Sequence, residues 1–362
     1  MPLETPLIAL HESAGAKMGE YFGVRLPARF GEFAAEYAAL RRAVAVIDTN
    51  FRAAFSFTGP DRQRYLNAVL TSNVRDLKAG RGTVGLLLTP QGHILAEVET
   101  FAGEDSILAF SHAMVRERTH STFEKFIIMD DVTLEDVTPS TATLDVVGPR
   151  AAALVSEIAE RNFVDMPLFA HKEAVLDRIA CRVVRREIAG DPAATLIVSR
   201  AQVADLWTAL VGRVRAHGGA PAGMEAFNSV RLEVGTPWFG TDYGDKQIPH
   251  EAGLEQSHIN YEKGCYTGQE IVERVRSRGH VNRRLTELQF STSAAPPAGT
   301  ALLRDGNDVG SVTSTGYSPR VGRAIGLGYV RREQSAIGTI LDASGTPAEV
   351  TEPPLPTKKT PV

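Results

Sequence analysis

The sequence predicts a protein of mixed α+β class that ends in a small β-barrel. Two observations predict this class. Before Arg284, helical and strand-like hydrophobic periods are intermixed without the strict alternation of a doubly wound sheet, and after Arg284 the chain breaks into short β-type runs. With 362 residues, 43% of them hydrophobic, the chain is long enough for two or three domains.

The region before Arg284 carries both kinds of period in an irregular order. Helices are predicted at 33–46, after Gly59-Pro60-Asp61, and at 115–127, 150–160, 201–217 and 223–234. Strands are predicted at 53–57, 84–88, 94–101, 132–137, 142–147, 182–188 and 195–200. The turn composition of Pro90-Gln-Gly-His93 joins two of these strands into a hairpin.

The region after Arg284 consists of evenly spaced β-type runs separated by turn residues. These runs span 285–290, 300–304, 310–315, 324–330 and 339–342. Their even spacing predicts a small barrel. Residues 351–362 form a proline-rich tail that we expect to be disordered.

Composition and charge exclude several functional classes. The net charge of -4 provides no general basic field for nucleic acid, and no apolar run long enough for a membrane span or a signal peptide is found. Two cysteines without ligand spacing are typical of a reducing cytoplasm, where we expect the protein. Cys181 alternates with apolar residues as a core strand residue does. The scattered histidines predict no metal site, and phosphate-binding, serine-hydrolase and zincin motifs are absent from the sequence.

The segment 263–270 has the features of a reactive site. Thr267 and Glu270 fit a capping box, so a helix is predicted to begin near Gly268. The helix start and the ammonium of Lys263 would both favour the thiolate of Cys265, two residues ahead of the helix cap. Such a cysteine can be a nucleophile, a redox centre or a single metal ligand. The structural alternative is a buried cysteine in a tight turn.

Two further charged features are weaker signals. Arg231 and Glu233 lie two residues apart, a pattern more typical of a surface pair than of a binding site. Five arginines between positions 274 and 284 form a basic cluster that could bind RNA or the polyglutamate tail of a folate, although charge runs usually form a solvated face.

Read together, four motifs resemble the signature region of the YgfZ family. The motifs are Arg231-Leu-Glu-Val-Gly, Ile248-Pro-His-Glu251, Lys263-Gly-Cys-Tyr-Thr-Gly-Gln-Glu270 and Arg278-Gly-His-Val-Asn-Arg-Arg284. The third motif is highly specific. A wider layout resembles the glycine-cleavage T-protein superfamily over about residues 30–345 and includes Ala45-Val-Ile-Asp48, Phe57-Thr-Gly-Pro-Asp61, Asn73-Val and Leu88-Thr-Pro-Gln-Gly92.

The resemblance implies a T-protein-like clover in which two α+β units and a C-terminal barrel surround a central folate site. It implies a folate-binding region at 1–282, with two subdomains interleaved in sequence, a barrel at 283–350 and the tail at 351–362. It also implies a tetrahydrofolate-binding accessory protein that supports assembly or repair of iron-sulfur client enzymes, including tRNA-modifying ones, through a reactive cysteine.

In this interpretation Cys265 is the functional residue. The ammonium of Lys263 favours the thiolate of Cys265, and Arg231 contacts a folate carboxylate. Tyr266 and Gln269, from the same motif, are further cofactor-binding candidates.

The chain departs from the T-protein pattern at two places. Where aminomethyltransferases carry an Asp-Asp pair, this sequence has Ala96-Glu97, which argues against the alternative function of a folate-dependent aminomethyltransferase or demethylase. Glu97 could still serve if the register differs by one residue. Asp191 replaces a T-protein glutamate and is predicted to hold the pterin edge, unless Gly190-Asp191-Pro192 is only a hairpin turn.

Overall fold

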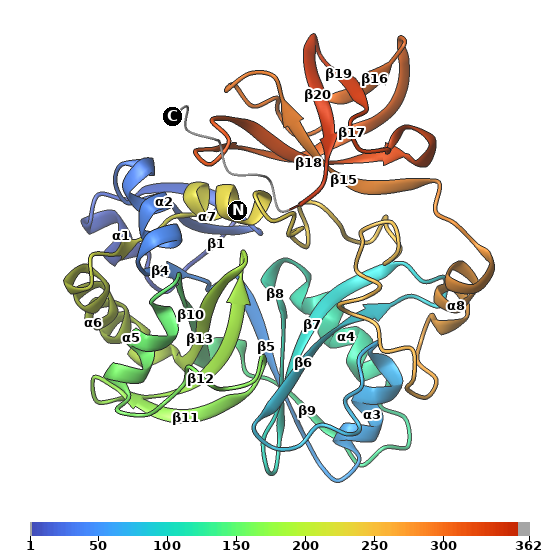
Figure 1. The fold of residues 1–362 in the computed structure, drawn as a ribbon. Coiled ribbons are helices and arrows are strands. Elements are labelled where there is room, and N and C mark those ends of the chain that lie inside the picture. Colours follow the sequence, from blue (N-terminus) through green and yellow to red (C-terminus); the bar gives the residue numbers. More distant parts are fainter. Residues whose placement is uncertain (1, 354–362) are drawn as a thin grey trace. The chain divides into compact units, whose positions relative to one another are not determined.

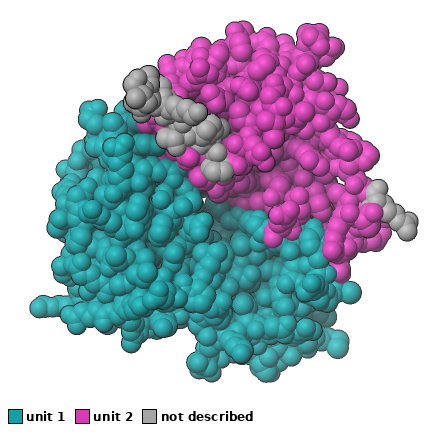
Figure 2. All heavy atoms as spheres, viewed as in Figure 1, with its two compact units in different colours: residues 1–88, 95–227, 257–267 teal, residues 89–94, 228–256, 268–362 magenta. Residues whose placement is uncertain are grey.

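The structure is a computed structural model and describes residues 2–353, except for the side chain of Arg278. Its internal contacts divide the chain into two compact units (Figure 2). The first unit contains residues 1–88, 95–227 and 257–267, and the second contains residues 89–94, 228–256 and 268–362. Each unit is therefore built from segments that are far apart in the sequence.

A six-stranded sheet forms one half of the first unit (Figure 1). In spatial order its strands are β11 (His171–Leu176), β12 (Ile179–Ile188), β13 (Asp191–Ser199), β10 (Thr141–Val147), β4 (Ala45–Asp48) and β14 (Ala220–Pro221). Neighbouring strands are antiparallel except for the parallel pair β4 and β14. The apolar residues on one face of this sheet pack beneath helices α5 (Ala151–Ile158) and α6 (Val203–Ala216).

A five-stranded sheet forms the other half of the first unit. In spatial order its strands are β6 (Arg81–Leu88), β7 (Ile94–Ala102), β8 (Ile107–His112), β5 (Arg52–Thr58) and β9 (Thr133–Asp136). One face of this sheet packs beneath α3 (Arg62–Val69) and α4 (Arg116–Phe126) in a core that includes Phe55, Phe57 and Phe123. The opposite face is available to meet the other sheet.

Smaller elements complete the first unit. A three-stranded sheet has the order β1 (Leu3–Glu4), β3 (Val24–Arg29) and β2 (Lys17–Tyr21). The remaining helices are α1 (Ile8–Ser13) and α2 (Phe33–Arg42), with α7 (Met224–Leu232) running along the chain from the first unit into the second. Short 3-10 turns lie at Ala113–Val115, Thr138–Ser140 and Arg200–Gln202.

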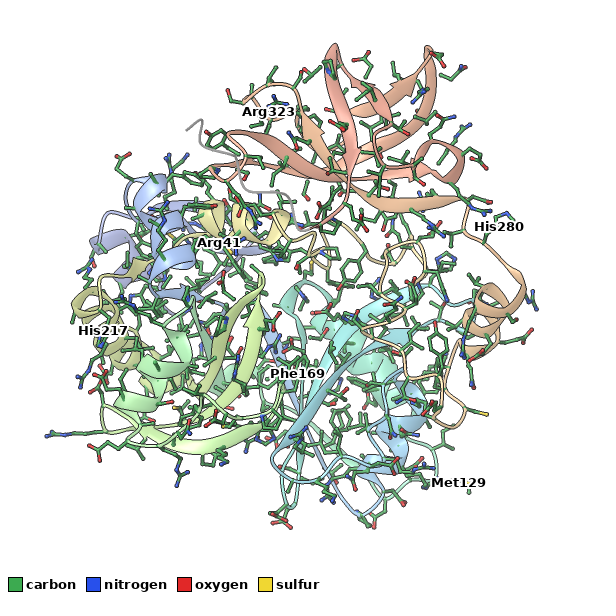
Figure 3. The ribbon with its side chains drawn as sticks, viewed as in Figure 1. Arg41, Met129, Phe169, His217, His280 and Arg323 are labelled. Carbon is green, nitrogen blue, oxygen red and sulfur yellow. The ribbon has the colours of Figure 1, made fainter. Side chains whose placement is uncertain are left out.

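The free faces of the two large sheets meet through a small apolar cluster. Phe101 and Phe110 of the five-stranded sheet pack there against Val184 and Ile197 of the six-stranded sheet. Phe169, labelled in Figure 3, packs against the same cluster. Any polar side chain that shares these two faces with the apolar cluster is therefore held between the sheets.

The second unit contains a closed six-stranded barrel, drawn in orange and red in Figure 1. Around the barrel the strands are β15 (Arg283–Phe290), β18 (Arg323–Arg331), β17 (Asn307–Ser318), β16 (Ala301–Arg304), β19 (Ile340–Ala343) and β20 (Thr346–Thr351). Inward residues such as Leu288, Phe290 and Val350 form its core. Helix α8 (Gln269–Arg278) and a 3-10 turn (Arg332–Gln334) also belong to this unit.

The predicted α+β class with a terminal barrel is confirmed, and two local predictions are wrong. Residues 45–46 belong to the fully buried strand β4, not to the end of a helix, because pairing with β10 and β14 overrides their helical propensity. The sixth barrel strand, β20, was not predicted because prolines and polar residues hide its alternation, and it ends at Thr351 inside the expected tail. The rest of that tail, from residue 354, lies outside the described residues.

Candidate functional site

A set of charged side chains, which we call the intersheet cluster, lies between the two large sheets of the first unit. Its members are Arg52, Glu97, Glu99, His112, Asp145 and Arg186. They come from five strands of both sheets, so the tertiary structure brings together residues that the sequence keeps far apart.

Alternation along β7 decides which of its residues reach the cluster. Ala96 and Val98 are fully buried in the apolar core beneath α3 and α4. Because successive side chains of a strand point to opposite faces, Glu97 and Glu99 face the other sheet. The loss of a carboxylate at position 96 therefore removes nothing from this face, and the prediction that Ala96 argues against transferase chemistry is wrong.

Glu99 and Arg186 form an ion pair that joins the two sheets. Nη2 of Arg186 lies 2.5 Å from Oε1 of Glu99, and each side chain is 11% exposed. Burial alone would raise the pKa of the Glu99 carboxyl, but the charges of Arg186 and Arg52 outweigh burial and hold the pKa below its usual value. The guanidinium of Arg186 also lies 4.8 Å from the ring centre of Phe169.

A second pair lies beside the first. Both terminal nitrogens of Arg52 are 3.4 Å from the carboxylate oxygens of Asp145. Thr195 donates its hydroxyl to Oδ1 of the same carboxylate at 2.7 Å. The cluster thus contains two buried guanidinium–carboxylate pairs whose charges compensate each other.

His112 is the titratable imidazole of the cluster. Burial, and secondarily the charge of Arg52, lower its pKa to about 4 against the opposing effect of Glu97 and Glu99. The imidazole is therefore neutral at physiological pH. Its ring stacks on Phe51 at 5.4 Å between centres and packs against Phe22 at the same separation.

Glu97 lies at the more open side of the cluster, where it meets the segment 257–267. Its Oε2 is 3.3 Å from Nε2 of His258, and the two side chains are 22% and 13% exposed. Nδ1 of His258 is 2.7 Å from the hydroxyl of Ser257. Glu97 is therefore a partly accessible carboxylate with an imidazole beside it, a pair suited to accepting a proton from a bound substrate.

The segment 257–267 is attached at two points to the end of α3 and the residues that follow it. Thr71 donates its hydroxyl to the carbonyl of His258 at 2.6 Å and accepts the amide of Leu86. The buried ammonium of Lys263 donates to the carbonyls of Asn67, Leu70 and Ser72. These contacts fix the position of the whole segment.

The structure corrects two predictions about the cysteine motif. Lys263 was expected to tune Cys265, but its three ammonium hydrogens are directed to three carbonyls, and burial lowers its pKa to about 7. Lys263 is therefore an anchor of the segment. The capping box is also wrong, because α8 is capped by Gly268 at φ 84° without a side-chain hydrogen bond.

The remaining motif residues differ in exposure. Cys265 is an exposed free thiol, while Cys181 is buried in the core, as its strand pattern predicts. Tyr266 is buried, with its ring centre 5.0 Å from Nζ of Lys263. Gln269, the first residue of α8, is partly exposed. The cofactor-binding roles of Tyr266 and Gln269 stay predictions.

Asp191 lies at the start of β13, next to the two-residue turn Ala189–Gly190. Its Oδ2 accepts a hydrogen bond from Arg41 at 2.6 Å. Pairing with Ile188 places Asp191 on the sheet face that also carries Arg186. The residue thus belongs to a hairpin and also shares a face with the intersheet cluster, so its predicted pterin contact stays a prediction.

Arg231 does not have the accessible position that was predicted. Its side chain is 1% exposed, and Nη1 lies 2.5 Å from Oδ2 of Asp242. The guanidinium also lies 4.3 Å from the ring centre of Trp238. Because the guanidinium is buried and ion-paired, the prediction that Arg231 meets a folate carboxylate is wrong, and the residue instead connects α7 to the loop before the barrel.

The basic cluster at 274–284 is partly neutralised by nearby carboxylates. Arg274 pairs with Glu270 at 2.7 Å, as the one-turn spacing predicts, and Arg283 pairs with Glu251 at 3.0 Å. This pairing reduces the field available to RNA. Among residues 2–353 no group of three or more metal-ligating side chains occurs, and no helix is long and apolar enough to cross a membrane.

Sequence reasoning found Glu97 but missed most of the cluster. Arg52, His112, Asp145 and Arg186 lie on strands whose pairing across two sheets cannot be read from one sequence. The detectable signal was Glu97 and Glu99 at alternate positions of a strand whose other residues, apart from Thr100, are apolar, since charged residues on a buried strand need partners.

A two-sheet α+β unit with charged residues between its sheets, followed by a closed barrel, defines the class of this protein. The GCVT N-terminal domain matches residues 7–260, and the glycine cleavage T-protein C-terminal barrel domain matches residues 283–355. The chain belongs to the glycine cleavage T-protein family, whose members use tetrahydrofolate as the one-carbon carrier.

Individual relatives agree with this assignment. The chain is 27% identical over 346 residues to the aminomethyltransferase of Rippkaea orientalis, covering 94% of this chain and 92% of that protein. It is 28% identical over 367 residues to that of Cutibacterium acnes, covering 97% of each. The crystal structure of the glycine cleavage system aminomethyltransferase T from Bartonella henselae has the same fold, with a TM-score of 0.88, 23% identity and 98% coverage of both chains.

Proposed function

We propose that this protein binds tetrahydrofolate at the intersheet cluster and transfers a one-carbon unit to it from an aminomethyl donor. The observation that carries this proposal is the orientation of Glu97, which places a carboxylate on the cluster face even though Ala96 lies in the core. The relatives named as aminomethyltransferases support the same chemistry.

Glu97 has the properties that the transfer requires of a base. A folate nitrogen that forms a bond to the incoming carbon must lose its proton, and a positioned carboxylate can accept it. Methylene-tetrahydrofolate forms when the carbon makes two bonds to folate nitrogens and loses its bonds to the sulfur and the nitrogen of the donor. Of the two protons that the folate nitrogens lose, one goes to the departing sulfur and one to the departing nitrogen. His112 is neutral, and Arg52 and Arg186 are ion-paired. These groups therefore keep the electrostatic potential around the Glu97 carboxylate constant.

Two measurements test this function. Tetrahydrofolate titrated into the purified protein by calorimetry should give heat of binding, and an aminomethyl donor should yield methylene-tetrahydrofolate with release of ammonia. Absence of both heat and thermal stabilisation at millimolar folate would contradict folate binding. Binding without any methylene-tetrahydrofolate would contradict the transferase step alone.

The exposed thiol of Cys265 favours a second candidate function. Within the motif that resembles the YgfZ family, it would serve iron-sulfur client enzymes, including tRNA-modifying ones, in the cytoplasm. In a strain lacking the gene, Cys265→Ser should fail to restore iron-sulfur enzyme activities while the original protein restores them. Full restoration by Cys265→Ser and Cys265→Ala would remove this candidate.

A further inference from the structure

Ser257, His258 and Glu97 form a row of hydroxyl, imidazole and carboxylate at the open side of the intersheet cluster. The hydroxyl of Ser257 lies 2.7 Å from Nδ1 of His258, and Nε2 of the same ring lies 3.3 Å from Oε2 of Glu97. The two ring nitrogens therefore have different partners.

The backbone around His258 is held by hydrogen bonds to Thr71. The carbonyl of His258 accepts the hydroxyl of Thr71 at 2.6 Å, and the amide of Asn260 donates to the carbonyl of Thr71 at 3.0 Å. Thr71 is itself fully buried and bound to the amide of Leu86 at 2.7 Å. The backbone of His258 is thus held by a buried threonine that lies between α3 and β6.

The partners of the ring select its tautomer. A serine hydroxyl can donate to Nδ1, which leaves the proton of a neutral imidazole on Nε2. An Nε2–H that donates to Oε2 restricts the rotation of the Glu97 carboxylate. Three other charged or titratable groups interact electrostatically with Glu97. They are Glu99, His112 and Arg186.

We propose that His258, set in its Nε2–H tautomer by Ser257, is a positioning residue that orients the Glu97 carboxylate as the base of the reaction. This inference rests on the proposed transferase function. His258 keeps its proton throughout, while Glu97 accepts the proton of the substrate nitrogen and later returns it to the leaving group.

The tautomer can be measured without turnover. In protein labelled with ¹⁵N-histidine, correlation spectra should show His258 with a proton on Nε2 and a bare, hydrogen-bonded Nδ1. Glu97→Gln should shift the Nε2 signal, and Ser257→Ala should produce a mixture of tautomers. A proton on Nδ1 in the unmodified protein, or an Nε2 signal unchanged by Glu97→Gln, would overturn the proposal.

Kinetics test the consequence for the reaction. His258→Ala should lower kcat for methylene-tetrahydrofolate formation by about 10²-fold, as expected for a misplaced catalytic group, with the folate Kd changed less than about threefold. Added imidazole should restore part of kcat, and His258→Gln, which keeps an N–H donor, should lose less than His258→Ala. His217→Ala, at a histidine labelled in Figure 3 that follows α6 and pairs with Glu157, is the control and should leave kcat unchanged.

The outcomes distinguish the positioning role of His258 from the proposed transferase function. An unchanged kcat in His258→Ala, or a folate Kd that worsens as much as kcat falls, would overturn the positioning role while leaving the transferase function intact. Absence of turnover in the unmodified protein would contradict the function, and the NMR experiment would then decide whether His258 still holds Glu97.

Discussion

Arg186 of β12 and Glu99 of β7 form an ion pair across two sheets, although they are 87 positions apart in the sequence. The pair lies beside the apolar contact between the sheets and next to Arg52 and Asp145. A charged contact of this kind contributes to stability only while both partners are present, because each charge is costly to bury alone.

Arg186→Met should lower the free energy of unfolding by about 3 kcal/mol, because it leaves the Glu99 carboxylate buried without its partner. The double variant Arg186→Met with Glu99→Leu should recover most of that loss. Urea denaturation measures both. Arg182→Met on the same strand is the control, and its exposed pair with Glu173 should be worth no more than about 1 kcal/mol. Equal losses in the two single variants would contradict the prediction.

Glu97→Gln should reduce kcat for one-carbon transfer by about 10²-fold or more, because the amide cannot accept the proton of the substrate nitrogen. Because the side chain of Glu97 is partly exposed, we expect little change in the free energy of unfolding. Initial-rate assays of methylene-tetrahydrofolate formation check the effect, with Glu104→Gln, at an exposed glutamate just after β7, as the matched control. A variant that retains full kcat would show that Glu97 is not the base.

Lys263→Met should loosen the segment 257–267, because three backbone carbonyls lose the ammonium that binds them. The amides of Asn260 and Thr267, which bond to residues 71 and 68, should exchange with solvent about tenfold faster or more. Hydrogen exchange followed by mass spectrometry reports this directly. Exposed Lys125→Met should leave the segment unchanged, and the same rates in both variants would refute the anchoring role.

Glu287 should make the stability of the barrel unit depend on pH. Neither carboxyl oxygen has a hydrogen-bond partner among the described residues, and burial raises the pKa of Glu287 from 4.5 to about 8. The folded state therefore holds a proton that the unfolded state releases above about pH 4.5. Stability from this group is fully present below that pH and is lost as the pH rises to about 8.

Glu287→Gln removes this titrating group. The free energy of unfolding of the variant minus that of the unmodified protein should therefore increase by on the order of 3 kcal/mol between pH 5 and 8. Denaturant unfolding at several pH values measures the difference. Exposed Glu349→Gln on β20 should show no such trend. A difference between Glu287→Gln and the unmodified protein that does not vary with pH would contradict the assigned protonation.

Much of the fold and part of the site could be predicted from local patterns. Hydrophobic periodicity located α4, α5 and α6 to within a few residues, and the turn residues of Pro90-Gln-Gly-His93 predicted the hairpin of β6 and β7. The strand β4 was mistaken for the end of a helix, because its burial between β10 and β14 depends on pairing partners 95 or more positions away in the sequence.

The sequence by itself determined the α+β class, the terminal barrel and the buried Cys181, because each depends on spacing within one segment. The candidate carboxylate Glu97 came from the resemblance to the T-protein pattern. Only the tertiary structure decided the surroundings of Glu97, the anchoring role of Lys263 and the burial of Arg231 against Asp242. A charged side chain has the same appearance in a sequence whether it meets a ligand, a carbonyl or another charge. Its role follows from which distant residue the fold places within a few ångströms.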